Sequence, residues 1–291
     1  MIEEPDIHEL KNVVVVGAGT MGSQIALQTA LSGRYQVTLV DSVAGQLDGA
    51  RQQNRRLLDR AVEKGRLSRE IADAALARIA DMPELATAVG SADVVIEAVI
   101  EDFDAKRGVF TELGKHAPKD AILASNSSTI AISRLADFTE RPEHCCNMHF
   151  FHPVTVMALC EVVRGPKTSE ETVSVAMAFV RSIDRVPVLL QKEIWGFIVN
   201  RVLFAASEEA MRLLEGGYAS VEDIDIAVQK GLNWPMGPFH LLDFSGLDIF
   251  YGAMRDRHKQ GEGADAPEVL RKLVESGNLG RKSGKGFFEY S

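Results

Sequence analysis

Short apolar runs alternate with longer amphipathic segments through roughly the first two-thirds of the 291-residue chain. Apolar runs of about four to eight residues are typical of strands, and the longer segments have apolar residues at helical spacing. Such alternation indicates a mainly parallel sheet with helices on its faces. The predicted strands cover residues 12–16, 36–40, 93–99, 121–125, 145–151, 159–163 and 186–190, and the predicted helices cover residues 20–32, 42–65, 68–76, 103–115, 130–136 and 170–183.

The strand signal disappears after about residue 191. Helices are then predicted over residues 196–215, 221–230 and 239–258, and a last one between Pro267 and Gly277. Ser220 is a typical N-cap, and Gly231 is a typical stop signal for the second of these helices. The pattern predicts an α/β domain over residues 1–190, followed by an all-α C-terminal domain over residues 191–291.

The first apolar run, residues 13–16, leads directly into a glycine-rich turn of the form G-x-G-x-x-G, built by Gly17, Gly19 and Gly22 around Thr20 and Met21. In a dinucleotide site, the first glycine makes the turn and the second lets the backbone approach a pyrophosphate. The third lets the following helix pack on the sheet, and that helix offers free N–H groups to the phosphates. The order of strand, glycines and helix predicts a Rossmann-type NAD-binding domain.

The cofactor preference follows from Asp41, which ends the second apolar run. A carboxylate there can accept hydrogen bonds from the adenosine ribose and would repel a 2′-phosphate. The next residues, 42–44, bring no arginine that could accept such a phosphate. NAD is therefore predicted in preference to NADP.

Composition narrows the class of protein. Apolar residues make up 46% of the chain, charged residues 25%, and the formal net charge is −9. These values indicate a globular protein with a sizeable core and argue against nucleic-acid and anionic-membrane partners. No apolar run approaches the roughly 20 residues that span a bilayer, and the acidic start resembles no signal peptide. The cysteines, Cys145, Cys146 and Cys160, fit neither a disulfide framework nor a zinc site, which favours a cytoplasmic location.

Polar or glycine clusters follow five separate apolar runs, at residues 17–22, 41, 97–101, 125–128 and 149–152. The carboxyl ends of parallel strands meet at one sheet edge, where ligands bind. NAD at that edge would support hydride transfer at a carbon bearing oxygen, and His149 or His152 is the candidate base. A structural histidine is the alternative interpretation. A metal site at this His-x-x-His pair is disfavoured because no third ligand is evident nearby.

The chain resembles the L-3-hydroxyacyl-CoA dehydrogenases of the short two-domain type, which include bacterial 3-hydroxybutyryl-CoA dehydrogenases. β-Hydroxyacid dehydrogenases share the glycine motif, but their catalytic lysine in a K-x-x-N helix is not found here. The matching segments appear in family order from residue 12 to residue 290, as VVVVGAGTMGSQIA, DVVIEAVIEDFDAK, ILASNSSTI, HFFHPVTVM with LCEVV, GFIVNRVL, PMGPFHLLD and GRKSGKGFF.

This resemblance implies roles for residues of the site. His149 would be the base toward the 3-hydroxyl, and Glu161 would orient its imidazole and stabilise the protonated form. Ser128 and Asn200 would hydrogen-bond the substrate near C3 and the thioester carbonyl. Without the resemblance, a solvated carboxylate and a surface amide would be the preferred interpretations of Glu161 and Asn200.

The resemblance also implies cofactor contacts. Glu101, Lys106 and Ser128 match positions near the nicotinamide and its ribose, and Lys282 matches another contact. The chain departs from its family at His152, where the pattern usually has asparagine in His-Phe-Phe-Asn-Pro. That asparagine is expected beside the nicotinamide, so the bulkier, titratable imidazole is expected to reshape this loop.

A basic helix follows Asp41 and has Arg51, Arg55, Arg56, Arg60 and Lys64 along it. Positions 56, 60 and 64 share one face at i,i+4 spacing. In an acidic protein this face suits the phosphorylated adenosine end of coenzyme A, and the family places a coenzyme-A-contacting lysine at position 64. The alternative is a solvated face balanced by Asp59 and Glu63.

The resemblance implies NAD-dependent oxidation of (S)-3-hydroxyacyl-CoA to 3-oxoacyl-CoA. An alternative keeps this chemistry but replaces coenzyme A with an acyl carrier protein. A non-catalytic NAD-binding protein is a third reading, disfavoured because His149, Glu161, Ser128 and Asn200 occur together. A homodimer is expected, because a helical domain this small needs a partner to bury its apolar faces.

Overall fold

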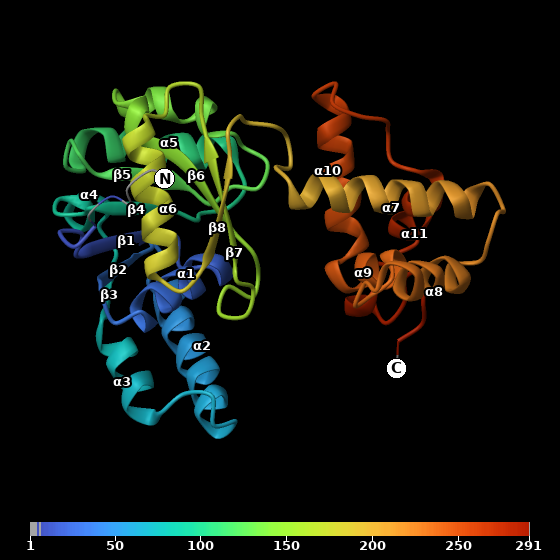
Figure 1. The fold of residues 1–291 in the computed structure, drawn as a ribbon, viewed down its shortest axis with the longest axis horizontal. Helices are drawn as coiled ribbons and strands as arrows, with labels where there is room; N and C mark the ends of the chain where they lie inside the picture. Colours follow the sequence, from blue (N-terminus) through green and yellow to red (C-terminus); the bar gives the residue numbers. More distant parts are fainter. Residues whose placement is uncertain (1–4, 6, 291) are drawn as a thin grey trace. The chain divides into compact units, whose positions relative to one another are not determined.

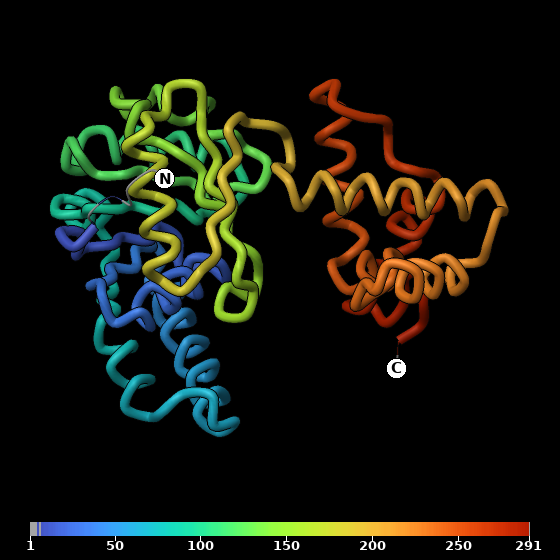
Figure 2. The backbone as a smooth tube through the Cα atoms, in the orientation of Figure 1, coloured from blue at the N-terminus to red at the C-terminus, as the bar shows by residue number. Residues whose placement is uncertain are grey.

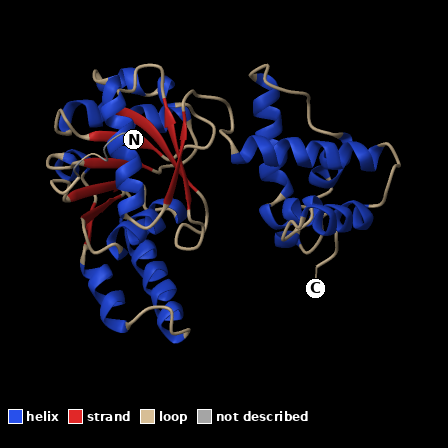
Figure 3. Ribbon diagram, viewed as in Figure 1, coloured by secondary structure: helices blue, strands red, loops and turns tan. Residues whose placement is uncertain are grey.

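The computed structural model describes residue 5 and residues 7–290 and contains two compact units. The first unit extends to Phe197, and the second begins at Ile198. The first is a sheet with helices on its faces, whereas the second is helical (Figures 1 and 3). The predicted fold class, a Rossmann-type α/β domain followed by an all-α domain, is confirmed.

The sheet of the first unit has eight strands in the order β3-β2-β1-β4-β5-β6-β7-β8. All neighbours pair in parallel except β6 and β7, which are antiparallel. The order reverses at β1, and this reversal places the predicted ligand edge beside the glycine-rich turn. The strands are β1 (Asn12–Val16), β2 (Gln36–Val40), β3 (Ile79–Met82), β4 (Val94–Glu97), β5 (Ile122–Ser125), β6 (Cys145–Phe150), β7 (Leu159–Arg164) and β8 (Val186–Leu190).

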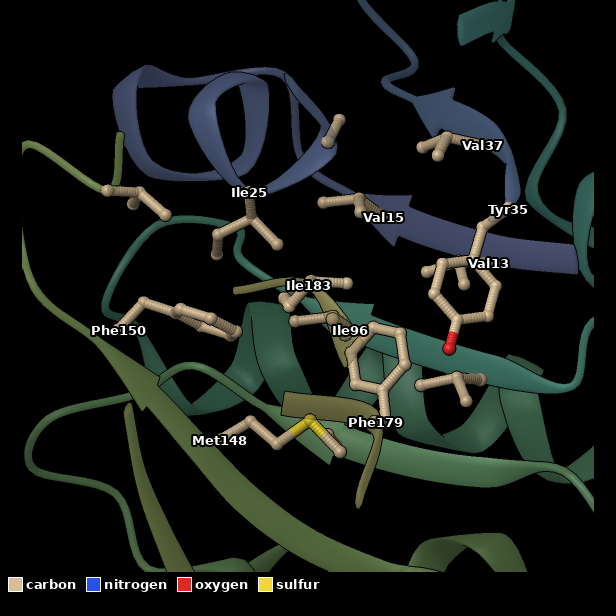
Figure 4. Packing of buried hydrophobic residues seen from close by; sticks show 14 of the residues in the cluster. Val13, Val15, Ile25, Tyr35, Val37, Ile96, Met148, Phe150, Phe179 and Ile183 are labelled. Carbon is tan, nitrogen blue, oxygen red and sulfur yellow. The ribbon is translucent and has the colours of Figure 1, made fainter. Parts of the chain in front are cut away.

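Alternate residues of the central strands pack on opposite faces of the sheet. Val13 and Val15 lie in one core cluster with Phe179, while Val14 lies in a second cluster with Phe110. Figure 4 shows the first cluster. The helices of this unit are α1 (Thr20–Leu31), α2 (Ala44–Glu63), α3 (Arg69–Ala77), α4 (Leu85–Val89), α5 (Phe103–His116) and α6 (Glu170–Ser182).

Three elements of the first unit differ from the sequence prediction. Strand β3 was missed because it is a four-residue edge strand interrupted by the polar Asp81, and the short helix α4 was also missed. The helix predicted over residues 130–136 is wrong, since η1 (Ile132–Arg134) and η2 (Ala136–Thr139) are 3-10 turns. Side chains outside the segment cap the first turn, because Asn147 accepts from the Ile132 N–H at 2.9 Å and Glu193 accepts from the Ser133 N–H at 2.7 Å.

The second unit is built from helices that pack through aromatic residues. Phe204 and Phe250 stack with ring centroids 4.1 Å apart. The single helix predicted over residues 239–258 is two helices, because Gly246 adopts a φ of +98° that no helix continues through. The helices are α7 (Val199–Glu215), α8 (Val221–Leu232), α9 (Pro238–Ser245), α10 (Leu247–Lys259) and α11 (Glu268–Glu275), followed by the 3-10 turn η4 (Arg281–Ser283).

Asp243, a buried carboxylate, explains why two motifs of the second unit occur together. It accepts hydrogen bonds from the N–H groups of Phe287 and Phe288, both at 2.9 Å, and from the Tyr290 hydroxyl at 3.0 Å. A Cβ at Gly286 would lie 2.0 Å from the same carboxylate, so only glycine fits there. The HLLD segment of α9 and the GKGFF segment near the end of the chain are therefore one packing unit.

All three cysteines have reduced, buried thiols in the first unit. Burial raises the pKa of Cys145 to about 11 and raises the pKa values of Cys146 and Cys160 still further. In the described residues, no helix has both the length and the apolar character needed to cross a membrane.

Candidate active site

The glycine-rich turn has the geometry of a phosphate cradle. Gly17 adopts a φ of +106° at the turn out of β1, and a Cβ at Gly22 would lie only 1.8 Å from the Gly17 carbonyl oxygen. A Cβ at Gly19 would meet nothing within 4 Å, so open space lies over this residue. Helix α1 begins at Thr20, followed by Met21, so its first N–H groups lie beside this space. The turn can therefore hold a pyrophosphate against the start of a helix.

Asp41 lies just past the end of β2 and is fixed by backbone donors. Its carboxylate accepts from the N–H of Ala18 and from that of Val43, each at 2.9 Å. These bonds join the acid to the glycine-rich turn at the edge where a ribose would bind. The side chains of Val43 and Ile100, beyond the ends of β2 and β4, are 58% and 73% exposed.

His149 and Glu161 are directly opposed residues of the antiparallel pair β6 and β7. The imidazole Nδ1 lies 2.8 Å from the Glu161 carboxylate, and both side chains are buried. A carboxylate only accepts, so Nδ1 carries the proton and Nε2 is left with a lone pair. Phe151 and Phe197 contact the imidazole with ring centroids 4.5 and 5.4 Å away. The histidine is thus held in one tautomer within an apolar surround, as a general base requires.

Glu101 organises the loop that carries Ser128. Its carboxylate accepts from the Thr129 hydroxyl at 2.9 Å, from the N–H groups of Ser128 and Thr129 at 3.2 Å, and from the Ser127 hydroxyl. The Lys106 ammonium lies 3.1 Å away. Burial alone would raise the pKa of Glu101, but Lys106 and these hydroxyl donors lower it below its usual range. The carboxylate therefore stays ionised and fixes the backbone at Ser128.

Two asparagines connect this loop to β6. The side-chain oxygen of Asn126 accepts from the Phe150 N–H at 2.9 Å, next to His149. Asn147 donates to the carbonyl oxygens of Ser125 and Ile130, at 3.4 and 3.2 Å. Sequence reasoning assigned neither a role, although a lone asparagine inside the apolar run of β6 was a usable signal.

The remaining cofactor and substrate candidates lie on both units. His152 is exposed on the loop after β6. Asn200 is the second residue of α7 in the second unit. Lys282 also belongs to the second unit, where its ammonium lies 2.7 Å from the Asp248 carboxylate. This contact lowers the pKa of Asp248.

The basic residues of α2 fall into separate groups. α2 and α3 form a helical hairpin (Figure 2). Arg51 pairs with Asp81 of β3, and Asp59 pairs with Arg69 of α3 at 2.6 Å. Lys64 is the exposed C-cap of α2. A cavity of about 500 Å³ is lined by Arg56, Arg60 and the glycine-rich turn, together with Ala18, Gly19, Thr20, Gln46, Gly49, Ala50, Gln53 and Leu57.

Among the described residues, no three histidine, cysteine, aspartate or glutamate side chains are grouped so that they could hold a metal ion.

Comparison with known proteins identifies the family. Residues 12–194 match the NAD-binding domain of 3-hydroxyacyl-CoA dehydrogenase, and residues 196–290 match its C-terminal domain. The chain is 39% identical to a probable 3-hydroxybutyryl-CoA dehydrogenase of Bacillus subtilis, over 97% of this chain and 98% of that protein. It is 37% identical to the human mitochondrial hydroxyacyl-coenzyme A dehydrogenase, over 97% and 91% of the two chains.

A solved structure agrees with these sequence matches. The crystal structure of (S)-3-hydroxybutyryl-CoA dehydrogenase PaaH1 from Ralstonia eutropha superposes with a TM-score of 0.92 at 35% identity, covering 97% of this chain and all of that one (100%). Both domains, the sheet and the NAD-binding edge thus have counterparts in one group of oxidoreductases. The chain belongs to the 3-hydroxyacyl-CoA dehydrogenase family and is an NAD-dependent oxidoreductase.

Proposed function

We propose that this protein oxidises (S)-3-hydroxyacyl-CoA to 3-oxoacyl-CoA, reversibly, with His149 as the base. The observation that carries the proposal is the buried His149–Glu161 pair, whose atoms lie 2.8 Å apart. It lies on the same sheet as the phosphate cradle, with strands β4 and β5 between β1 and β6. A dinucleotide whose phosphates lie at the end of β1 can extend along the sheet edge toward a base on β6.

The residues present fit NAD. The open space over Gly19 admits the pyrophosphate, and the Asp41 carboxylate is held where the adenosine ribose would bind. When bound, the cofactor supplies the acceptor for the two electrons and the hydrogen that leave C3 of the substrate. The chain's own residues must orient the substrate and move the hydroxyl proton.

His149 Nε2 takes that proton from the 3-hydroxyl as the carbonyl forms. Glu161 keeps Nδ1 protonated and stabilises the positive charge that the imidazole gains. Phe151 and Phe197 exclude water from the ring, which strengthens this interaction. In the reverse direction, the same Nε2 returns its proton to the oxygen as 3-hydroxyacyl product forms.

Ser128 and Asn200 are the proposed donors to the substrate oxygens. Glu101 fixes the backbone of Ser128, so its hydroxyl can hold the C3 oxygen with little rearrangement. The resemblance assigns Asn200, together with Ser128, to the substrate near C3 and the thioester carbonyl, and it assigns Lys106 and Lys282 to the cofactor. His152 completes the proposed cofactor contacts in place of the usual asparagine.

Arg56, Arg60 and Lys64 are proposed to bind the phosphates of coenzyme A. Arg56 and Arg60 line a cavity that also includes the glycine-rich turn, so their cations lie beside the space assigned to the pyrophosphate of NAD and can meet a second phosphorylated ligand from there. An acyl carrier protein would instead meet these cations through an acidic surface.

Oxidation of NADH by acetoacetyl-CoA, followed by absorbance, tests the reaction. We expect turnover with NADH and little with NADPH. Acetoacetyl-pantetheine lacks the adenosine phosphates and should show a raised KM with a similar kcat. No turnover with acetoacetyl-CoA, but turnover with an acetoacetyl carrier protein, would assign the enzyme to the alternative substrate.

We also propose that residues 1–190 bind NAD, that residues 191–291 serve substrate binding and dimerisation, and that the enzyme works in the cytoplasm as a homodimer. The second unit supports dimerisation, because large apolar side chains on it are exposed. Sedimentation at several concentrations tests the oligomeric state, and a monomer at micromolar concentration would refute it. The exposed residues are Ile198, Val202, Tyr218, Ile226, Leu232, Phe244 and Ile249.

A further inference from the structure

Glu97, the last residue of β4, is a fully buried carboxylate inside a polar network. One oxygen accepts from the Lys106 ammonium at 2.7 Å and from the Val99 N–H at 2.8 Å. The other accepts from the hydroxyl of Ser125, its partner on β5, at 2.6 Å. Among the described residues, only hydrogen-bond donors therefore contact this carboxylate.

The network contains more negative than positive charge. The Lys106 ammonium is itself 1% exposed and lies between Glu97 and Glu101, 2.7 and 3.1 Å from their oxygens. Among the described side chains, Lys106 is the one cation within 4.0 Å of either carboxylate. Two carboxylates share one ammonium, so this triad (Glu97, Lys106 and Glu101) has a formal charge of −1.

The triad lies at the half of the sheet edge that the nicotinamide would occupy. Asp41 marks the adenosine half beyond β2, and the glycine-rich turn marks the phosphates beyond β1. The rest of the dinucleotide must extend over β4 and β5 toward His149 on β6. Glu101, the 40% exposed end of the triad, is on that side.

We propose that Glu97 gives this edge an excess negative charge that strengthens the binding of NAD⁺ relative to that of NADH. The inference rests on the proposed function, which requires that both forms bind here. The two forms differ by one unit of positive charge on the nicotinamide ring. A fixed negative charge at this edge would attract the oxidised form and have no such attraction for the reduced one. Glu97 would thus raise the affinity for NAD⁺ relative to that for NADH without touching the cofactor.

Glu97→Gln tests this inference because it removes the charge and keeps the side-chain size. The readout is the ratio of the dissociation constant of NAD⁺ to that of NADH, by titration calorimetry. Loss of one negative charge from this edge, screened by an effective dielectric constant of about 20 to 40, predicts that the ratio rises roughly five- to thirtyfold. A purely structural role would weaken both forms alike and leave the ratio unchanged.

Two controls separate charge from packing. Ser125→Ala removes the 2.6 Å hydrogen bond to Glu97 but no charge, so it should leave the ratio within about twofold of wild type. Glu97→Asp keeps the charge, so its ratio of dissociation constants should equal that of wild type. If Glu97→Gln does not fold, Glu101→Gln removes the same charge from the exposed end, and its ratio should rise likewise.

An unchanged ratio in a folded, NADH-binding Glu97→Gln protein would overturn this inference alone. It would leave the proposed function intact, because turnover of acetoacetyl-CoA by wild type is measured separately. Wild-type protein that bound neither form of the cofactor would overturn both.

Discussion

At the scale of single residues, the proposed reaction depends on His149 and on its orientation by Glu161. His149→Gln should lower kcat by roughly 10²- to 10⁴-fold, the usual contribution of a positioned acid–base group. Glu161→Gln should lower kcat by the same mechanism, since the tautomer and the charge stabilisation are lost. NADH affinity should stay near wild type in both and serves as the control for folding. Turnover close to wild type in His149→Gln would move the base elsewhere, with His152 the next candidate.

His152 departs from the family pattern, so it has a separate expected effect. If its imidazole lies beside the nicotinamide, its protonated form repels the positive ring of NAD⁺ and not the neutral ring of NADH. Lowering the pH from about 8 to about 5.5 should then weaken NAD⁺ more than NADH. His152→Asn should keep activity and remove this pH dependence from the ratio of the two dissociation constants. Parallel curves for the two proteins would show that His152 does not sense the cofactor charge.

The sequence predicted the residues of this site unevenly. Family motifs singled out His149 and Glu161, and their cross-strand pairing explains why they lie 12 positions apart. Glu97 was included only as part of a polar cluster, because a carboxylate at the end of an apolar strand gives no sign of its partners. Its partner Lys106 lies on a helix, and such contacts between elements are fixed only by tertiary packing.

At the scale of elements, helix α2 offers a direct test of the coenzyme A site. Replacing Arg56 and Arg60 with Gln should raise KM for acetoacetyl-CoA, mostly at low salt where surface charges are least screened. Arg55→Gln is the matched control, since Arg55 lines a different cavity against α3. An unchanged KM at low ionic strength would make the Arg56–Arg60 face an ordinary solvated surface.

The Asp243 contacts predict how the second unit responds to alkaline pH. Burial and the Asp243 carboxylate raise the pKa of Tyr290 above its ordinary value. The folded state then binds the phenol proton more tightly than the unfolded state, so stability is full below about pH 10 and falls above it. Tyr290→Phe should cost about 0.5–1.5 kcal/mol near pH 7. It should also remove the part of the loss of stability expected above about pH 10 that comes from Tyr290.

The free energy of unfolding, measured with denaturant near pH 7 and again above about pH 10, checks this prediction. Tyr218→Phe is the control, because Tyr218 is 79% exposed and its removal should change neither quantity. Equal alkaline losses in wild type and Tyr290→Phe would show that another group is responsible.

Element prediction worked where periodicity was long and failed where side chains from elsewhere decided the backbone. The buried central strands and the long helices followed from their apolar patterns. The segment at residues 130–136 has helical spacing, yet Asn147 and Glu193 divert its N–H groups into tight turns. Strand β3 is too short for a pattern and forms because β2 is available to pair with it.

At the scale of the whole molecule, the candidate site residues are divided between the two units. The first unit contains His149, Glu161, the loop that carries Ser128 and the glycine-rich turn. Asn200 and Lys282 belong to the second. The sequence predicted both domains because the strand signal ends where the helical one begins. It could not predict the contacts within the second unit, such as that of Asp243 with the chain end, because they join distant segments.

The buried thiols have a practical consequence for labelling the two units separately. Maleimides react with exposed thiolates, and the raised pKa values of Cys145, Cys146 and Cys160 leave them protonated and out of reach. New cysteines at the exposed positions Lys119 and Tyr218, one on each unit, could therefore be labelled with a fluorophore pair while all three native cysteines remain. Energy transfer between the dyes would then report the separation of the units as cofactor and substrate are added.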